Sequence, residues 1–333
     1  MPKKHRASIE LPSVKRKTRS DKTGVVVADS GPGAAEPGPP QPGLVVANHG
    51  LHVALQDDSR ALWHCTRRRS VTTVVAGDQV IWQALPDGTG VIIECLPRTS
   101  LLARPDRTGA AKPIAANIDR MIIVAAVIPP FNERLIDRYI VGAEISGIQP
   151  LIVVNKIDLL DHRQRDEIAG RLSLYREIGY EVLFTSTIDG AHLQEFANRV
   201  SGKTSVLVGK SGAGKSSLIN TLLPDLDIRI AALSEATSLG RHTTTATMLY
   251  ELPGGGNIID SPGIRDFSIG NIGPALVERG FIEFRSLHGR CKFNDCLHRA
   301  EHHCAVKDAV ESGAIHRSRY LSYLELLNEL APA

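Results

Sequence analysis

The sequence Asn155-Lys156-Ile157-Asp158 stands before Gly209-Lys210-Ser211-Gly212-Ala213-Gly214-Lys215-Ser216, and this order decides the fold. The later stretch has the spacing of a loop that wraps phosphate groups, and the earlier one has the spacing of a loop that reads a nucleotide base. The common order in such domains is the reverse, with the phosphate loop first. Both stretches follow apolar runs typical of strands, so we interpret the order as a circular permutation. Such a rearrangement is tolerated when the old chain ends lie close together at the surface.

The phosphate loop follows the apolar run Val206–Val208 and opens a helical pattern, which is the context that such a loop requires. Its glycines let backbone N–H groups converge on the β-phosphate, and the start of the helix adds a positive dipole. We expect Lys215 to reach the β- and γ-phosphates, Ser216 to bind Mg²⁺ and Ser217 to meet the α-phosphate. The candidate phosphate-binding residues are Gly209, Lys210, Ser211, Gly212, Ala213, Gly214, Lys215, Ser216 and Ser217.

The base-reading pattern predicts selectivity for guanine. The Asp158 carboxylate can accept the N1–H and 2-amino protons of guanine, whereas adenine leaves it unpaired, a mismatch worth on the order of 10⁴-fold. We expect Asn155 to tie the two loops together and Lys156 to lie along the base or the loop, with Ile157 between Lys156 and Asp158. Ser186 follows the next strand and is a candidate backbone donor to guanine O6. The expected nucleotide is therefore GTP or GDP, bound with Mg²⁺.

A further apolar run ends at Asp260-Ser261-Pro262-Gly263. We expect Asp260 to hold Mg²⁺ through water and Gly263 to donate its N–H to the γ-phosphate. The stretch Gly240–Thr245 lies between a helix and a strand, where a switch loop belongs. Thr245 is the residue there that we expect to complete the Mg²⁺ shell.

Ile264 stands where Ras-like enzymes place a glutamine that orients the attacking water. Because an isoleucine cannot orient water, slow intrinsic turnover is expected, and a partner is expected to supply or position the missing group. Such activation is worth roughly 10³–10⁵-fold. His242 is the nearest candidate in sequence for this role, and the alternative is a surface histidine of the switch loop.

Three of the five cysteines fall within 14 residues near the C-terminus. An odd number with this crowding indicates a metal site in a reducing compartment rather than a disulfide framework. Three thiolates and one imidazole form a closed set suited to one structural, tetrahedral Zn²⁺. His302 and His303 are rival ligands. The expected ligands are Cys291, Cys296, His298 and Cys304.

Charge is unevenly distributed. Residues 1–22 carry eight Lys or Arg against two acidic residues, a net charge of +6. The whole chain has a net charge of +3, so the remaining residues have a net charge of about −3. A basic arm of this kind contacts nucleic acid through counterion release, although a solubilising tail is the alternative. No run approaches the roughly 18 apolar residues needed to span a bilayer, and no hydrophobic signal segment follows the N-terminus. We expect a cytoplasmic protein without membrane contact.

The length of 333 residues predicts two or three domains, and the fold class is α/β. Residues 1–43 read as the basic arm and a disordered Gly/Pro-rich linker. Residues 44–103 contain five short apolar runs separated by turns, which predict an OB-type β-barrel, although an SH3-like barrel would give almost the same pattern. Residues 104–270 alternate strand and helix, as a circularly permuted P-loop domain should. Residues 271–333 become helical around the cysteines and predict a zinc-binding helical domain.

Basic residues mark two of these regions. The expected barrel has a basic edge at Arg67–Arg69 and Arg98, and such barrels commonly bind oligonucleotides. Cys65 and Cys95 fall within its strands and are expected to be inert core thiols. The cysteine-rich segment carries its own basic side chains, which form either an RNA-contact surface or a solvated face; they are Arg290, Lys292 and Arg299.

Over roughly residues 44–330 these features together resemble the bacterial ribosome small subunit-dependent GTPase A family (RsgA, also called YjeQ). The resemblance implies a GTP hydrolase that binds the 30S particle late in its maturation, forms GDP when the particle stimulates it, and then leaves. It also implies that the OB and zinc domains contact 16S rRNA and that His242 takes part in hydrolysis. The long N-terminal extension is less typical. The resemblance is carried by Lys112–Asp119, Asn155–Asp158, Gly209–Ser217, Gly240–Thr245, Asp260–Gly263 and the four zinc ligands.

Two other functions fit the same residues. A permuted GTPase serving the large ribosomal subunit would share the nucleotide motifs, although the barrel and the cysteine segment argue against it. A guanine-nucleotide sensor that clamps RNA without meaningful hydrolysis is the other, and Ile264 leaves room for it. We expect a monomer in each case.

The base-reading role of Asp158 predicts that Asp158→Asn shifts preference from guanosine to xanthosine nucleotides, because the amide presents a donor where the carboxylate presented an acceptor. Competition binding with GDP and xanthosine diphosphate measures this shift. Unchanged selectivity for GDP would refute the role.

Overall fold

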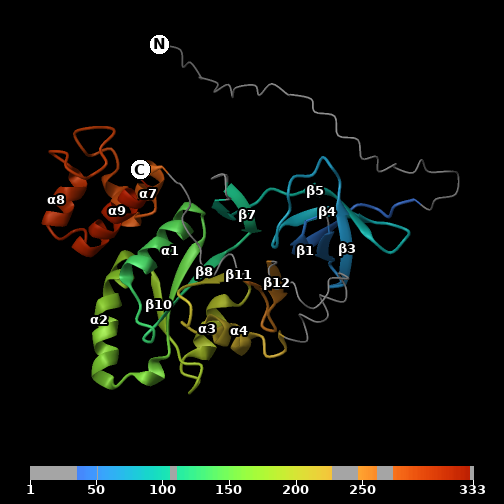
Figure 1. Ribbon diagram of the computed structural model, residues 1–333, viewed down its shortest axis with the longest axis horizontal. Coiled ribbons are helices and arrows are strands. Elements are labelled where there is room, and N and C mark those ends of the chain that lie inside the picture. Colours follow the sequence, from blue (N-terminus) through green and yellow to red (C-terminus); the bar gives the residue numbers. More distant parts are fainter. Residues whose placement is uncertain (1–35, 51, 106–110, 227–246, 261–272, 331–333) are drawn as a thin grey trace, which may run out of the picture. The chain divides into compact units, whose positions relative to one another are not determined.

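Figure 1 shows the computed structural model of the chain, which describes residues 36–50, 52–105, 111–226, 247–260 and 273–330. The basic arm and most of the Gly/Pro-rich linker lie outside these ranges. So do the stretch Gly240–Thr245, with His242 and Thr245, and the residues Gly263 and Ile264. The expectations that rest on them stay predictions.

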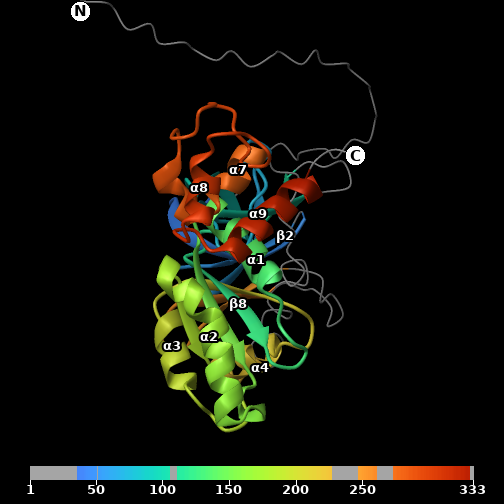
Figure 2. The same ribbon diagram turned by 90° about the vertical axis from the view of Figure 1, so that its left-hand side faces the viewer.

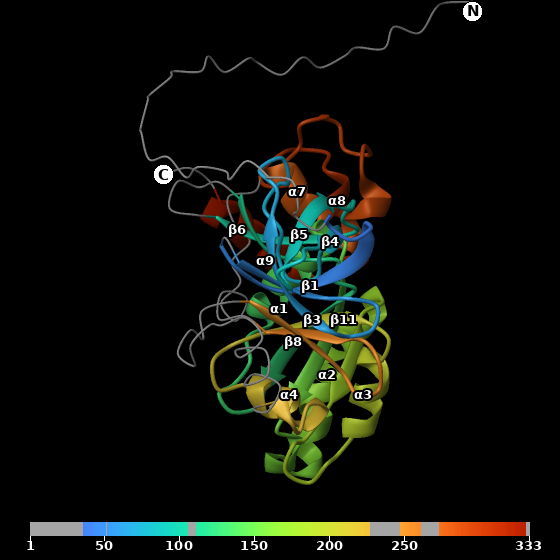
Figure 3. The same cartoon turned by 90° about the vertical axis from the view of Figure 1, so that its right-hand side faces the viewer.

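The first described region is a closed barrel, which confirms the OB-type expectation (Figure 3). The strands follow the order β1-β2-β3-β5-β4, and β4 pairs back onto β1 to close the ring. β3 and β5 run parallel and the other pairs antiparallel. This is the five-stranded Greek-key arrangement of an OB fold. The strands are β1 (Gln41–His49), β2 (His52–Gln56), β3 (Leu62–Arg67), β4 (Gln79–Ala84) and β5 (Gly90–Cys95).

The barrel core forms around Trp82, whose side chain is fully buried and whose indole N–H donates to Pro42 O at 3.1 Å. Alternation along each strand sends one face inward, as a closed barrel requires. Cys65 is fully buried in this core, and burial raises the pKa of its thiol to about 12. Burial also raises the pKa of the half-buried Cys95. Both thiols are therefore held in the protonated, unreactive form that the sequence led us to expect.

The expected basic edge is only partly present. Arg98 donates to both carboxylate oxygens of the fully buried Asp78, at 2.7 and 2.8 Å, and to Thr73 O at 2.8 Å. Asp78 also accepts the Val75 N–H at 2.7 Å. Arg98 is thus a structural cation of the turn before β4, because a buried carboxylate needs a partner. Arg68 and Arg69 remain exposed.

A two-stranded hairpin follows the barrel and crosses the expected domain boundary between residues 103 and 104. It consists of β6 (Leu101–Pro105) and β7 (Ala111–Ala116). The hairpin is bonded to the barrel through Ala116 N, which donates to Ala76 O at 3.0 Å. The sequence did not predict it.

The second sheet has the order β10-β9-β8-β11-β13-β12, parallel except for β12, which runs antiparallel to β13. All seven residues of its central strand β8 are buried, as expected for a sheet covered on both faces. β12 also pairs with β1 at Met248 and Ala47, which joins the two sheets. The strands are β8 (Arg120–Ala126), β9 (Gln149–Asn155), β10 (Glu181–Phe184), β11 (Thr204–Val208), β12 (Met248–Glu251) and β13 (Asn257–Asp260).

The helices of this domain start where the sequence provides caps. Asn132 caps α1 (Glu133–Ile145) by accepting the Arg134 N–H, and Asp161 forms a capping box at α2 (His162–Ile178). α1 and α2 lie side by side (Figure 2), since the Tyr175 hydroxyl of α2 donates to Asp137 of α1 at 2.8 Å. The remaining helical elements are η1 (Ile157–Leu159), α3 (Leu193–Val200) and α4 (Lys215–Leu222).

The C-terminal region is helical, as expected. Its core is a cluster of aromatic rings in which Tyr323 meets Phe281 and Phe284 edge-on, with centroids 5.5 and 5.1 Å away. None of the helices in the described ranges is long and apolar enough to cross a membrane. The elements here are α7 (Pro274–Arg279), η2 (Ile282–Leu287), α8 (Ala305–Glu311) and α9 (Arg317–Leu330).

The buried Asp78 generates a prediction for the barrel. Asp78→Ala leaves the Arg98 guanidinium and the Val75 N–H without their acceptor, so we expect a loss of about 3–5 kcal/mol in the free energy of unfolding. Chemical denaturation measures it. Glu94→Ala, at an exposed position of β5, is the matched control and should change stability by less than about 0.5 kcal/mol. Equal stabilities of the two variants would contradict the structural role of Asp78.

Candidate functional site: nucleotide loops and a metal centre

The loops expected to hold a nucleotide meet at one edge of the second sheet. β9 ends at Asn155, β10 at Phe184, β11 at Val208 and β13 at Asp260. These strands are parallel, so their carboxyl ends lie along the same edge, where ligands bind in open α/β sheets. Two stretches far apart in the sequence are thereby brought to one place.

Two glycines of the phosphate loop occupy positions that no other residue fits. Gly209 has φ of 138°, and a Cβ there would lie 2.2 Å from Val124 O. Gly214 has φ of 94°, and a Cβ there would lie 2.2 Å from Asn155 Nδ2. Both backbone conformations and both close approaches exclude a side chain. The loop therefore lies directly against β8 and against the base-reading loop.

Lys215, the first residue of α4, is buried and curls back over the loop that precedes it. Its ammonium group donates to Gly209 O at 2.6 Å and to Lys210 O at 3.0 Å. These contacts hold a positive charge inside the loop, at the N-terminus of a helix. The arrangement is that of an anion-binding loop.

Asn155 joins the two loops. Its side chain is fully buried; Nδ2 donates to Ala213 O at 3.1 Å, and Oδ1 accepts from the Thr185 hydroxyl at 3.4 Å. Lys156 makes a second link, because its ammonium donates to Gly212 O and to Ile128 O, both at 2.7 Å. Asn155 and Lys156 thus both link the base-reading loop to the phosphate loop.

Asp158 is oriented by Ser186. The Ser186 hydroxyl donates to Asp158 Oδ1 at 2.6 Å and accepts the Ile188 N–H at 3.1 Å. The backbone N–H of Ser186 donates to Ala191 O at 3.2 Å. Ser186 therefore contributes through its hydroxyl, which fixes the base-reading carboxylate, and its N–H is already used within the loop.

A cavity of about 390 Å³ opens between the loops. Its size lies in the range of small-molecule sites. Ser216 lines it and offers a hydroxyl oxygen, a kind of donor that Mg²⁺ prefers. Asp260 ends a strand at the same edge of the sheet. The lining residues are Lys156, Ser211, Gly212, Gly214, Lys215, Ser216 and Ser217.

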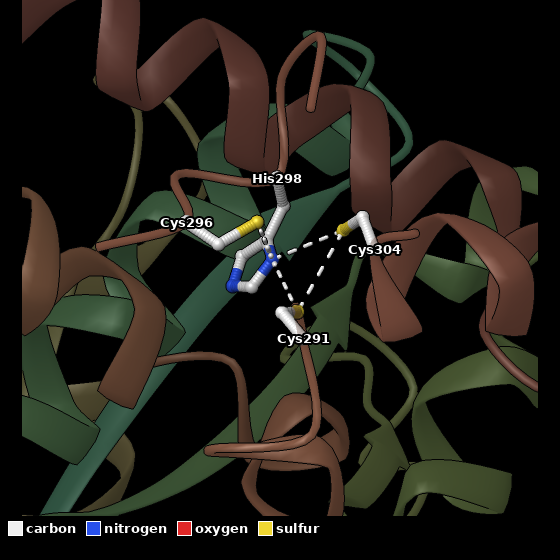
Figure 4. A group of neighbouring side chains, drawn as sticks. All are labelled: Cys291, Cys296, His298 and Cys304. Carbon is white, nitrogen blue, oxygen red and sulfur yellow. Dashed lines mark hydrogen bonds between the residues drawn. The ribbon is translucent and has the colours of Figure 1, made fainter. Parts of the chain in front are cut away.

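The metal-ligand candidates of the C-terminal region converge as Figure 4 shows. One potential ligand atom from each of Cys291, Cys296, His298 and Cys304 lies within 4.8 Å of all the others. The imidazole Nδ1 of His298 is 3.6, 3.4 and 3.2 Å from the sulfurs of Cys291, Cys296 and Cys304, respectively. Three sulfurs around one imidazole nitrogen are a donor set that could hold a metal ion. The rival residues His302 and His303 are exposed and lie outside the cluster.

Groups outside the ligand set fix the histidine. Its Nε2 makes no hydrogen bond and points toward Glu278 Oε1 at 3.6 Å, an arrangement typical of the carboxylate–histidine pairs behind metal ions. The contact with His298 holds the pKa of Glu278 below its ordinary value, so the carboxylate stays charged. Tyr320 donates to His298 O at 2.6 Å, and Tyr323 donates to Leu297 O at 3.0 Å. These residues fit a metal bound at Nδ1.

Comparison with known proteins shows the family to which the chain belongs. The family model described as RsgA GTPase matches residues 95–270, which is about half of the chain. The small ribosomal subunit biogenesis GTPase RsgA of Ectopseudomonas mendocina is 46% identical over 297 residues, covering 88% of this chain and 87% of that protein. The protein of the same name from Haemophilus influenzae is 43% identical over 298 residues, with coverage of 88% and 86%. The chain belongs to the RsgA GTPase family.

Solved structures of this family share the fold. YjeQ from Thermotoga maritima superposes with a TM-score of 0.73 at 31% identity, over 88% of this chain and 99% of that chain. YloQ, described as a circularly permuted GTPase, superposes with a TM-score of 0.70 at 30% identity, over 91% and 98%. The reversed order of the two nucleotide stretches is therefore a circular permutation.

Sequence reasoning missed Glu278 of this RsgA-family site and assigned Ser186 a role for its backbone N–H only. Glu278 lies 20 positions before His298 and on helix α7, whereas His298 lies in a loop, so no spacing pattern connects them. The hydroxyl of Ser186 was not recognised as the group that orients Asp158. A serine directly after a strand, next to a base-reading loop, is a signal that could have suggested it.

Glu278 supports a testable prediction. Glu278→Gln removes the charge behind His298, so the affinity for metal should fall about 10- to 100-fold. Competition with a colorimetric chelator measures it, and Glu311→Gln, an exposed position on α8, should leave the affinity unchanged. The double substitution Cys291→Ala/Cys296→Ala should abolish binding. Equal affinities of Glu278→Gln and the control would contradict the role of Glu278.

Proposed function

We propose that this chain is a ribosome-associated GTPase that acts late in the assembly of the 30S subunit, is stimulated by that particle, and leaves it after hydrolysing GTP to GDP. The relatives named as small ribosomal subunit biogenesis GTPases cover 88% of the chain and support this proposal. The observation that carries it is the assembly of a phosphate loop and a guanine-reading loop around one cavity, joined by Asn155.

In this proposal Asp158 reads the guanine ring, and the loop Gly209–Ser217 binds the phosphates. Lys215 serves the β- and γ-phosphates, and Ser217 the α-phosphate. Ser216 and Asp260 hold Mg²⁺, with Thr245 as the third residue. The ion, when bound with GTP, neutralises the charge that develops on the phosphate oxygens.

The water-activating step rests on residues outside the described ranges. Gly263 is proposed to donate its N–H to the γ-phosphate, and His242 to orient the attacking water once the ribosomal particle positions it. Ile264 supports this dependence, because it offers no group that can orient water. Stimulation by the particle follows from that deficiency.

The metal centre is proposed to hold one structural Zn²⁺, because a closed set of three thiolates and one imidazole suits that ion best. Arg290, Lys292 and Arg299 are exposed beside it. With the exposed Arg68 and Arg69 of the barrel, they support contact with 16S rRNA at two places.

The proposed organisation has four parts: an arm and linker over 1–43, the OB domain over 44–103, the GTPase domain over 104–270 and the zinc domain over 271–333. The hairpin β6–β7 spans the boundary between the OB and GTPase domains. A monomer located in the cytoplasm fits a factor that visits the ribosomal particle and leaves. The basic arm is proposed as a further contact with RNA.

GTP turnover by the purified protein tests the function. We expect slow release of phosphate by the protein alone and at least a tenfold faster rate with 30S particles, because the particle supplies or positions the missing group. Lys215→Ala, which lacks the ammonium group proposed to serve the β- and γ-phosphates, should show no turnover under either condition. Stimulation by 50S particles alone would indicate a large-subunit factor, and stimulation by neither particle would indicate a nucleotide sensor.

A further inference from the structure

A buried ion triad connects the C-terminal helices to the GTPase domain. Arg319, the third residue of α9, is 0% exposed and donates to Asp137 of α1 and to Glu283 of η2. The contact with Glu283 uses two guanidinium nitrogens, at 2.7 and 3.3 Å. The side chains of Asp137 and Glu283 are 2% and 11% exposed. The guanidinium also lies 4.5 Å from the centre of the Phe281 ring.

Such a triad fixes the relative orientation of the helices more than it raises the free energy of unfolding. Burying a charge costs desolvation free energy, which the attraction to its partners offsets only when the geometry is good. Apolar residues of the same volume often give equal or greater stability. A planar guanidinium held by two carboxylates and one ring allows only a narrow range of orientations. Asp137 accepts in addition the Tyr175 hydroxyl at 2.8 Å. The triad therefore fixes how α9 and η2 sit against α1 and α2.

Helix α1 lies beside the phosphate loop. Ile136 and Tyr139, on either side of Asp137 along the helix, line a second cavity of about 300 Å³ together with Lys210 and Ala213 of the phosphate loop. The loop that leads into α1 is bonded to the site as well, because Lys156 donates to both Ile128 O and Gly212 O. A displacement of α1 would thus change the surroundings of the phosphate loop.

We propose that Arg319 is a positioning residue for the nucleotide site: acting through Asp137, it holds α1 where α1 supports the phosphate loop. This inference rests on the guanine-nucleotide site proposed above. Linkage makes it reciprocal: if α9 favours the nucleotide-binding arrangement of α1, bound nucleotide must favour the docked arrangement of α9 by the same factor.

The substitution Arg319→Lys tests the proposal, because lysine keeps the charge and loses the planar fork. We expect the dissociation constant for a fluorescent GDP analogue to rise about tenfold, with unchanged kcat for GTP in the folded protein. A merely structural role would instead reduce the fraction of active molecules, and so lower kcat without changing the dissociation constant. Circular dichroism and metal content establish that the variant is folded.

A matched control lies on the same two helices. Arg134 of α1 pairs with Glu325 of α9 at 2.8 Å, but both side chains are exposed, so Arg134→Gln should leave the affinity for GDP within twofold of the wild type. An affinity of folded Arg319→Lys equal to that of this control would overturn the proposal. Failure of the wild type to bind GDP would refute the proposed function instead.

Amide hydrogen exchange provides a test that needs no variant. In the wild-type protein, saturating GDP should slow exchange in residues 317–330 of α9, which lie outside the nucleotide loops. Exchange in α9 that is unaffected by GDP would overturn the inference, even if Arg319→Lys failed to fold.

Discussion

The nucleotide site depends on the hydrogen bond from Asn155 Nδ2 to Ala213 O, which joins two stretches 58 residues apart. The side chain that makes it is fully buried, so both of its polar atoms need partners, and the Thr185 hydroxyl supplies the second. An amide meets these demands because it donates and accepts at once, whereas a carboxylate has no proton for Ala213 O. The close approach then dictates the residue opposite, since Gly214 has no room for a Cβ beside Asn155. One amide thus fixes the distance between the loop for the base and the loop for the phosphates.

The parts of the structure that were predicted are those that local patterns determine. The alternation of strands and helices, the phosphate loop between strand and helix, and the spacing of the cysteines each carry their signal within a few residues. Helix α3 was missed because it is short and its N-cap residue, His192, has a left-handed conformation and makes no side-chain cap. Arg98 was taken for a surface cation, since its partner Asp78 lies 20 residues away and only the fold brings them together. The pairing of Glu278 with His298 was missed for the same reason, because only the fold brings these two residues together.

The permutation costs little closure entropy because the chain is rejoined between two elements that are close together. Helix α3 ends at Val200 and β11 begins at Thr204, so only residues 201–203 separate the end of the base-reading half from the start of the phosphate-binding half. A short connection between elements that already lie close costs little closure entropy. The parallel order of the sheet is then independent of the order in which the chain supplies its strands. The site forms at the same edge because the strand ends, and not the sequence order, place the loops.

In this permuted chain the C-terminal helices contact the first helix of the GTPase domain through side chains. The strand β8 is the first of the domain in sequence and β13 the last, and they flank β11. After β13 the chain proceeds toward α7 and α9, and α9 returns to α1, the helix that follows β8, through Arg319 and Asp137. The first helix of the GTPase domain and the last helix of the C-terminal region are therefore held together by a buried ion triad. A covalent connection is permanent, whereas this contact has an equilibrium that a ligand on either side can bias. A partner that binds the C-terminal helices consequently has a physical route to the phosphate loop that passes through α1.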